Sequence, residues 1–275
     1  MSRDQEPLHD ERLNDGLSAV AAGTGPPLVI LPGFGPGTDL SVRVPRSAAW
    51  STVALARGFR RRIHLIHRPL HPPAGMTVAA LAGWHATAFR DRFGEPVDVM
   101  GISAGGVTAL QLELDHPLVL CSAASRVSPH GLSELLRLIE AEDQGRSGAA
   151  IGSSLIAHGP LRLLLLAAFE LSRGQPRAPG EAMLVQAAQS WDVTERLGEI
   201  GVPVLVAGGT RDRVVPPELM QATASGIPGA RLLLLPGRGH ASALYDLRLK
   251  PAIEAFLEDR PDNGATKAVG AKRCR

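Results

Sequence analysis

Short apolar runs alternate with amphipathic stretches along most of the chain. The runs are rich in Val, Ile and Leu and read as continuously apolar, which predicts strands that are buried on both faces. They occupy residues 28–31, 63–66, 97–100, 118–122, 202–207 and 231–235. Apolar residues at helical spacing lie between them, at 47–57, 77–93, 104–114, 216–225 and 241–257, with Thr77 as a candidate helix cap. This alternation predicts a doubly wound α/β fold with a mostly parallel sheet.

The middle of the chain does not follow this alternation. Residues 129–189 contain no strand-like run, and their apolar spacing is helical at 132–142, 155–172 and 181–189, with loop-like connectors at 145–152 and 174–180. We therefore expect an inserted helical cap. The leucine-rich run 161–169 has leucines on nearly every side, which predicts a helix buried between this cap and the sheet.

These patterns also set the expected domain limits. Residues 16–128 and 190–258 would form the α/β core, and residues 129–189 the helical cap. Residues 18–22 are the one candidate for a leading strand, so the first strands of the sheet are expected to be missing or irregular. The polar ends, 1–15 and 259–275, are expected to be disordered tails.

Composition narrows the classes of partner. The net charge of +2 is nearly balanced and gives no reason to expect nucleic acid or an anionic membrane as a partner. Short basic clusters such as Arg60-Arg61-Arg62 are expected on the solvated surface. Two cysteines form no disulfide framework, and Cys121 in an apolar stretch predicts a small buried residue. With no apolar leader and no run long enough to span a bilayer, we expect a cytoplasmic protein; its oligomeric state is open.

Residues 101–105 (GISAG) place a serine between a strand and a helix. A sharp strand-to-helix turn holds its central residue in a strained conformation, and the small neighbours Gly101 and Gly105 let strand and helix approach. The hydroxyl of Ser103 would then project above the carboxyl edge of the sheet, where a helix N-terminus favours developing negative charge. The pattern indicates a nucleophile, and an ordinary Gly-Ser turn is the alternative.

A glycine-rich loop, residues 32–37 (PGFGPG), follows the first of the buried runs. Acyl transfer generates an oxyanion that needs two preorganised hydrogen-bond donors. The backbone N–H of Ala104 is one candidate donor, and the backbone N–H of Phe34 in this loop is the other. The alternatives are a plain turn or a phosphate-binding loop, but the Gly-Lys-Ser/Thr of such loops does not follow.

Two further polar residues come just after later strands. Asp212 follows the run 202–207, and His240 lies in a glycine-rich loop between the last run, 231–235, and a helix. None of the other eight histidines has this setting. Other carboxylates could take the place of Asp212: Asp98, Asp192 and Asp246.

Three histidines lie near one predicted strand, a grouping that raises the question of a metal site. His64, His67 and His71 surround the run 63–66, but no carboxylate joins them at ligand spacing, so we expect no metal ion. His67 and its neighbour Arg68 come at the carboxyl end of that strand and are expected to face the pocket.

In this order, the four motifs resemble the serine α/β-hydrolase family, in its one-domain members with a short helical cap. The resemblance covers residues 28–257 and the chain order Ser, Asp, His is that of the family. It implies that Ser103 is the nucleophile, that His240 is the general base and then the general acid, and that Asp212 orients His240.

The resemblance also bears on the oxyanion hole and on cofactors. It implies backbone N–H donors from Phe34 and Ala104 and no cofactor. The loop departs from the commoner pattern, because many relatives have His-Gly where this chain has Pro32-Gly33.

Four residues are candidates for lining the substrate pocket: Gly33, His67, Leu164 and Leu165. Gly33 belongs to the oxyanion loop and His67 to a strand end. The two leucines belong to the run 161–169, which would line a lipophilic acyl or alcohol pocket; simple packing of the cap is the alternative.

The expected activity is that of a carboxylesterase acting on a small lipophilic, ester-like substrate through an acyl-enzyme. The same residues would serve an acyltransferase, thioesterase, lactonase, C–C bond hydrolase or cofactor-free perhydrolase. A non-catalytic family member that binds a ligand or partner is a further alternative. The family's dehalogenases and epoxide hydrolases are disfavoured, because they use an aspartate where Ser103 stands and the latter need cap tyrosines, whereas Tyr245 is the one tyrosine here.

Overall fold

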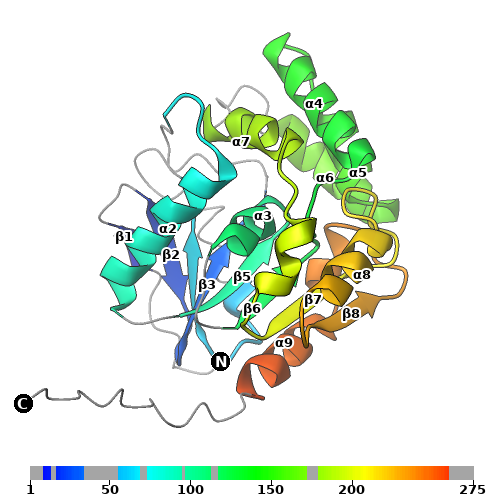
Figure 1. The fold of residues 1–275 in the computed structure, drawn as a ribbon. Coiled ribbons are helices and arrows are strands. Elements are labelled where there is room, and N and C mark those ends of the chain that lie inside the picture. Colours follow the sequence, from blue (N-terminus) through cyan, green and yellow to red (C-terminus); the bar gives the residue numbers. More distant parts are fainter. Residues whose placement is uncertain are drawn as a thin grey trace, which may run out of the picture.

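The computed structural model describes residues 9–13, 17–33, 55–68, 73–94, 97–112, 117–171 and 179–259. They form an eight-stranded sheet in the order β1-β2-β4-β3-β5-β6-β7-β8, with helices on both faces (Figure 1). β2 is antiparallel to β1 and β4, and all other neighbours pair in parallel, which confirms the expected doubly wound fold. The strands are β1 His9–Arg12, β2 Ser18–Ala22, β3 Pro27–Leu31, β4 Arg62–Ile66, β5 Asp98–Ile102, β6 Leu118–Cys121, β7 Val204–Gly209 and β8 Arg231–Leu235.

The described helices fall into two groups: those that follow the strands of the sheet, and four α-helices that are inserted after β6, ahead of a 3-10 helix that precedes β7. The first group comprises α2 Val78–Phe93, α3 Ala104–Gln111, α8 Pro217–Gly226, α9 Leu249–Glu258 and the 3-10 helices η1 Thr194–Glu199 and η2 Ser242–Tyr245. The inserted helices, which gather above one end of the sheet in Figure 1, are α4 Pro129–Asp143, α5 Ala149–Ile156, α6 Gly159–Leu171 and α7 Pro179–Gln189. Within these described helices, none is long and apolar enough to cross a bilayer.

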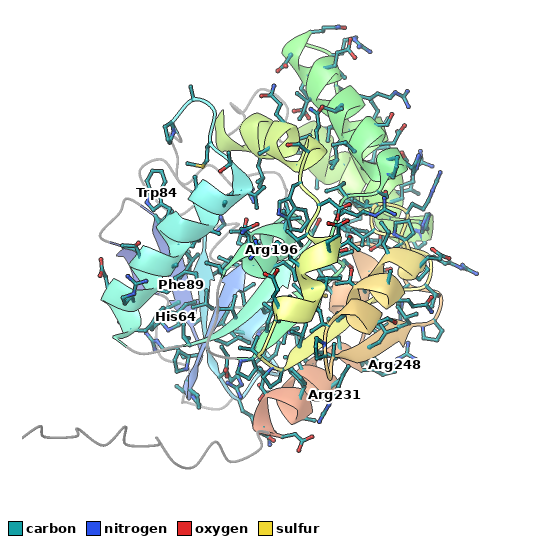
Figure 2. All side chains as sticks on the ribbon, in the orientation of Figure 1. His64, Trp84, Phe89, Arg196, Arg231 and Arg248 are labelled. Atoms are coloured by element: carbon teal, nitrogen blue, oxygen red, sulfur yellow. The ribbon has the colours of Figure 1, made fainter. Side chains whose placement is uncertain are left out.

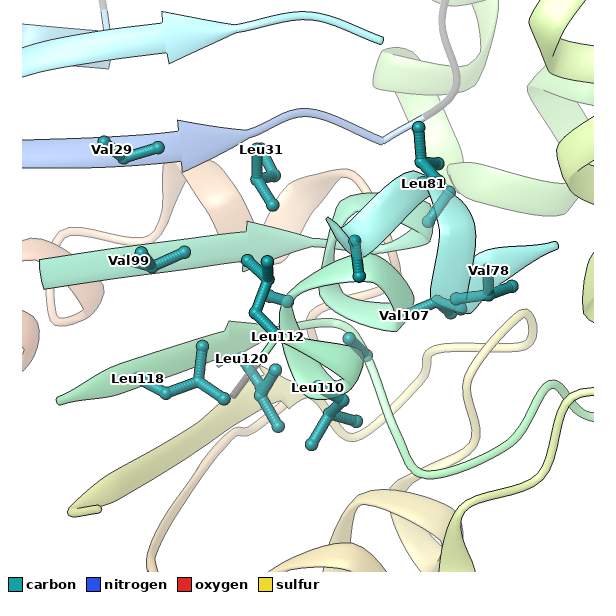
Figure 3. Packing of buried hydrophobic residues seen from close by; sticks show 14 of the residues in the cluster. Val29, Leu31, Val78, Leu81, Val99, Val107, Leu110, Leu112, Leu118 and Leu120 are labelled. Carbon is teal, nitrogen blue, oxygen red and sulfur yellow. The ribbon is translucent and has the colours of Figure 1, made fainter. Parts of the chain in front are cut away.

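Side chains of the parallel strands alternate between two apolar layers. Val29, Leu31 and Val99 face α2 and α3 on one side of the sheet (Figure 3). Leu28 and Ile30 face the opposite layer, which α9 covers. Because both faces are buried, the strands read as unbroken apolar runs in the sequence.

The chain order of the central strands creates a switch point. β3 pairs with β4 on one side and with β5 on the other. The chain leaves β3 toward β4 and then returns through α2 to β5. The connections after β3 and β5 therefore run in opposite directions from the carboxyl end of the sheet. Ligands bind at such a point in open α/β sheets.

Thr77 caps α2 as expected, because its hydroxyl accepts a hydrogen bond from the Ala80 N–H at 3.1 Å. Of the helix expected at 47–57, residues 55 and 56 are helical, and residues up to 54 lie outside the described residues. The expected helix 155–172 is two helices, α5 and α6, and α5 begins inside the connector expected at 145–152.

Two expectations about the ends of the chain were wrong. His9–Arg12 form β1, an edge strand, within the tail 1–15 that was expected to be disordered, and they complete the sheet. A short, charged edge strand shows no alternation of apolar and polar residues, so the sequence pattern did not predict its pairing with β2. The closing helix expected at 241–257 is divided, because the Asp246 carboxylate accepts the Arg248 N–H at 3.0 Å and separates η2 from α9.

Arg61 is buried, although its basic cluster was expected on the surface. Its side chain is 6% exposed, its Nη1 donates to Asp98 Oδ2 at 2.6 Å, and its Nε lies 3.5 Å from Glu254 Oε2. Two buried carboxylates compensate its charge, and one of them comes from α9, far along the sequence. Cys121 is buried as expected, and burial raises the pKa of its thiol to about 12.

The leucine-rich helix α6 is not buried between the inserted helices and the sheet. Leu163 and Leu164 are 68% and 66% exposed, and Leu171 is exposed as well. α6 packs on α5, and its other side faces solvent. An all-round apolar pattern therefore led to a wrong prediction here.

Candidate active site

Ser103 lies at the turn between β5 and α3 in a strained backbone conformation. Its φ is 51° and its ψ is −117°. Among the described residues other than glycine, Ser122 alone shares a positive φ. The Ser103 N–H donates to the Cys121 carbonyl at 2.9 Å, which anchors the strained residue to β6. Such strain is kept where the surrounding structure enforces it, most often at functional sites.

Two glycines permit this turn. A Cβ on Gly101 would lie 2.4 Å from the Gly106 Cα, and a Cβ on Gly105 would lie 2.0 Å from the Leu31 carbonyl oxygen. Any side chain at either position would push α3 away from the sheet. The small flanking residues expected from the sequence are therefore required by close backbone contact.

A chain of hydrogen bonds leads from Ser103 into the protein. The Ser103 Oγ lies 2.9 Å from Nε2 of His240, and Nδ1 of the same ring lies 2.8 Å from Asp212 Oδ2. With the ring proton on Nδ1, His240 donates to the carboxylate, and Nε2 is left to accept from the hydroxyl. The structure thus brings together the three side chains that the sequence singled out.

Asp212 is fixed by its own loop. The N–H groups of Val214 and Val215 both donate to its Oδ1 at 2.9 Å, which leaves Oδ2 for His240. The loops that carry the two residues are also joined, since the Arg211 N–H donates to the Arg238 carbonyl at 2.7 Å. Backbone N–H groups thus hold the Asp212 carboxylate, and the carboxylate in turn orients the His240 ring.

The other candidate acids have partners elsewhere. Asp98 pairs with Arg61 at the opposite end of β5. Asp246 accepts from Arg248 and from Arg238, and the hydrogen bonds from Arg248 are the main cause that holds its pKa well below the usual range. Asp192 accepts the Thr194 N–H at 2.8 Å. Among the described carboxylates, Asp212 is the one that contacts His240.

Of the two proposed oxyanion donors, Ala104 directly follows Ser103. Ala104 begins α3, where backbone N–H groups have no partner inside the helix. A Cβ on Gly33 would lie 3.0 Å from the Ser103 Cβ, so the loop after β3 touches the serine. Arg68 donates to the Pro32 carbonyl at 3.2 Å and, over a longer 3.5 Å, to the Gly33 carbonyl. Phe34 lies outside the described residues.

An apolar pocket of about 40 Å³ opens at Ser103. Its walls come from α3, the segment after β6, the loop after β7 and the inserted helices α4 and α7. The described residues that line it are Ser103, Ala104, Val107, Ala123, Ala124, Arg126, Val127, Leu132, Leu135, Leu184, Val185, Ala188, Val214 and Val215.

This lining differs from the four pocket residues expected from the sequence. Gly33 touches Ser103 without being part of the pocket wall, and Leu164 and Leu165 lie on α6 outside it. The sequence missed the contribution of α7. Leu184 and Ala188 stand one helical turn apart there, a signal that is much weaker than the dense leucine run of α6.

His67 is buried beside this site but is not in the pocket wall. Desolvation and the nearby Arg68 charge lower its pKa to about 3, and neither ring nitrogen has a hydrogen-bond partner among the described residues. His64, labelled in Figure 2, packs edge-on against Phe93 at 5.0 Å. Over the described ranges, no three His, Cys, Asp or Glu side chains are grouped to hold a metal ion; His71 lies outside those ranges.

Comparison with known proteins assigns the family. Residues 28–249 match the model of the alpha/beta hydrolase family, and the chain belongs to this family. A pimeloyl-[acyl-carrier protein] methyl ester esterase of Nitrosomonas europaea is 25% identical over 239 residues, which cover 81% of this chain and 91% of that protein. A Pseudomonas syringae protein provisionally named a carbamate hydrolase is 31% identical over 176 residues, or 59% of this chain and 68% of its own length.

Solved structures of the same fold are numerous. An alpha/beta hydrolase, MGS-M2, from a deep-sea metagenome library has a TM-score of 0.70 at 18% identity, covering 89% of this chain and 95% of that chain. The enol-lactonase of Burkholderia xenovorans has a TM-score of 0.65 at 21% identity, covering 92% of this chain and all of that one. At these identities, the likeness shows the shared fold alone.

Proposed function

We propose that this protein is a serine carboxylesterase that cleaves a small lipophilic, ester-like substrate through an acyl-enzyme. One observation carries the proposal: Ser103, held at a strained turn, is hydrogen-bonded through His240 to Asp212 at the mouth of an apolar pocket. A nucleophile, a base and a group that orients the base are the parts that acyl transfer through serine needs.

In the first half-reaction, the Ser103 Oγ attacks the substrate carbonyl carbon and His240 Nε2 accepts the hydroxyl proton. The carbonyl oxygen becomes an oxyanion, which the backbone N–H groups of Phe34 and Ala104 stabilise. His240 then gives the proton to the leaving alcohol, and the acyl group stays on Ser103. Asp212 stabilises the ring while it carries the extra proton.

In the second half-reaction, water replaces the alcohol. His240 accepts a proton from the water as its oxygen attacks the acyl-enzyme, and the same two N–H groups hold the second oxyanion. Collapse of this intermediate returns the proton to Ser103 and releases a carboxylic acid. No cofactor or metal ion is needed for either half.

The size of the pocket favours a short acyl group. A water molecule needs about 10–15 Å³ of cavity by the same measure, so a cavity of about 40 Å³ accommodates a group of a few non-hydrogen atoms. Leu132 from α4 and Leu184 from α7 form part of its apolar wall. We assign residues 129–189 the role of a cap that selects the substrate.

The names of the relatives support this chemistry, because they share the type of bond that is cleaved. The Nitrosomonas relative is named for methyl ester cleavage and the Pseudomonas relative for carbamate cleavage. Each of these substrates presents a carbonyl carbon bonded to a leaving oxygen or nitrogen. A simple ester is our first choice because the pocket offers an apolar wall and little space.

A fluorophosphonate probe, followed by mass mapping of the adduct, tests the nucleophile. We expect one adduct, on Ser103, that is lost in Ser103→Ala and kept in Ser122→Ala, the other described serine with a positive φ. An adduct that survives Ser103→Ala would refute the proposal. A series of p-nitrophenyl esters from acetate to octanoate, with matched thioesters and lactones, then tests the substrate class; activity rising toward octanoate would contradict a small acyl pocket.

A further inference from the structure

One charged residue, Arg126, belongs to the wall of the pocket at Ser103. Apart from Ser103, every other described residue of that wall is apolar. Arg126 is itself exposed, so it stands where the pocket meets solvent. A cation beside a small apolar space attracts an anion more strongly than a cation surrounded by water, because the effective dielectric constant is lower there. A substrate that fills the pocket therefore comes close to a positive charge.

The backbone around Arg126 is held from both sides. Arg126 forms an antiparallel β-bridge with Asp192, and the Val193 N–H donates to the Ser125 carbonyl at 3.0 Å. The Ser125 N–H donates to the Thr223 Oγ1 of α8 at 2.9 Å. Because these contacts use the main chain of the segment that carries Arg126, they fix its place in the wall. They also remain when its side chain is replaced.

The guanidinium of Arg126 is available to a ligand. Among the described residues, none accepts a hydrogen bond from it or forms an ion pair with it. Hydrogen bonds from Thr194 are the main cause that lowers the pKa of Asp192, and the Arg126 charge is a minor one. The Thr194 N–H occupies the Asp192 Oδ1 at 2.8 Å. The five N–H donors of a guanidinium form a fork that matches a carboxylate.

The size of the pocket sets how far such an anion can be from the reacting carbonyl group. Ser103 and Arg126 belong to the wall of one space of about 40 Å³, and Leu132 and Leu184 form part of its apolar wall. That space holds a chain of about two or three CH₂ groups. A substrate with its carbonyl carbon at Ser103 would thus bring an anionic group at the end of a short chain to Arg126.

We propose that Arg126 determines specificity for half-esters of short dicarboxylic acids, in which the acyl chain ends in a carboxylate. This inference rests on the proposed serine esterase function and names its substrate class. The CH₂ groups pack against the apolar wall, and the terminal carboxylate accepts hydrogen bonds from the Arg126 guanidinium. The ester C–O bond breaks as derived above, the alcohol leaves with a proton from His240, and water completes the release of a dicarboxylate.

The test uses two methyl esters of nearly equal size that differ in charge. Monomethyl succinate has a free carboxyl group that is ionised at pH 7, and methyl 4-oxopentanoate has a neutral acetyl group in its place. The ratio of the two kcat/KM values is measured for the wild type, Arg126→Gln, Arg126→Lys and Arg137→Gln. Arg137 is the matched control, because it lies on α4, pairs with Glu134 at 2.7 Å and is not part of the pocket wall.

We expect the wild type to favour monomethyl succinate about 10-fold in kcat/KM, since hydrogen bonds to a charged group are the stronger ones. Arg126→Gln should lose this preference and Arg137→Gln should keep it. A general change in rate cancels in the ratio. Arg126→Lys, which keeps the charge without the fork, should keep part of the preference. In the wild type, about 0.5 M NaCl should reduce the preference by screening, a measurement that needs no variant to fold.

The absence of a preference for monomethyl succinate in the wild type would overturn the inference. A preference in Arg126→Gln equal to that in Arg137→Gln would do so as well. Failure of the proposed function has a different signature, because the wild type would then hydrolyse neither ester and Ser103 would carry no fluorophosphonate adduct.

Discussion

The two ends of β5 carry buried polar networks that differ in one respect. At the amino end, Asp98 pairs with Arg61, which Glu254 also approaches, so that charges compensate one another inside the protein. At the carboxyl end, the hydrogen bonds from Asp212 through His240 finish on the Ser103 hydroxyl, which opens to the pocket. Burial of polar groups is common to both ends. The difference is that the second network ends at a place a substrate can reach.

Breaking the network at the carboxyl end should have the largest effect of all these changes, and that effect should be on catalytic activity. In Asp212→Asn, the amide oxygen can still accept the Val214 and Val215 N–H groups, but its NH₂ would face His240 and favour the wrong ring tautomer. We expect kcat to fall about 10⁴-fold with little change in the free energy of unfolding. Steady-state ester hydrolysis and urea unfolding measure both.

Asp246→Asn is the matched control, because Asp246 was a rival acid and pairs instead with Arg238 and Arg248. Its kcat should stay within about 3-fold of the wild type. A larger loss for Asp246→Asn than for Asp212→Asn would reverse the assignment of the acid.

Breaking the amino-end network should affect stability instead. Arg61→Met leaves two carboxylates without their buried cation, which should lower the free energy of unfolding by about 3–5 kcal/mol. The kcat of the folded protein should not change. Urea unfolding with parallel assays measures the two quantities.

The neighbouring Arg60→Met provides the control, since Arg60 pairs with Glu258 at the exposed surface and should contribute less than about 1 kcal/mol. If Arg61→Met is as stable as Arg60→Met, the amino-end network is not what stabilises this end of the sheet.

Mild acid should have a smaller effect, through the buried histidines. His67 has a folded-state pKa of about 3, whereas an unfolded chain would titrate near 6.5. Between these values the unfolded state binds more protons, so the free energy of unfolding should fall as pH drops from about 6.5 toward 3 and should be fully retained above 6.5. Urea unfolding at pH 7 and pH 4.5 would show the loss.

His67→Gln should reduce that difference between the two pH values, because one of the groups that titrate only on unfolding is gone. Surface His130→Gln should leave it unchanged. Identical pH dependence in His67→Gln and the wild type would mean that His67 titrates in the folded protein as it does in the unfolded one.

The sequence predicted features that depend on local patterns. Continuous apolar runs predicted β3 to β8, and the small residues around Ser103 predicted the tight turn, because both constraints act between near neighbours. The joining of Asp212 and His240 followed from their positions at the carboxyl ends of parallel strands. All of these are consequences of strand direction and spacing.

Features that depend on a distant partner were not predictable in this way. Arg61 looked like a surface residue because its partner Glu254 lies on α9. The run 161–169 looked buried, yet α6 has a packed neighbour on one side only. The pocket walls on α4 and α7 have ordinary apolar spacing, which does not show which face meets the site.

The place where the inserted helices leave and rejoin the sheet has a consequence for how such enzymes diversify. Arg126, just before α4, forms an antiparallel bridge with Asp192, just after α7, and the Val193 N–H donates to the Ser125 carbonyl at 3.0 Å. The two ends of the insertion are thus fastened side by side. The segment between them can therefore change in length or sequence while the strands beneath keep their register. New substrate specificities can arise in this way without disturbing the sheet that carries Ser103, Asp212 and His240.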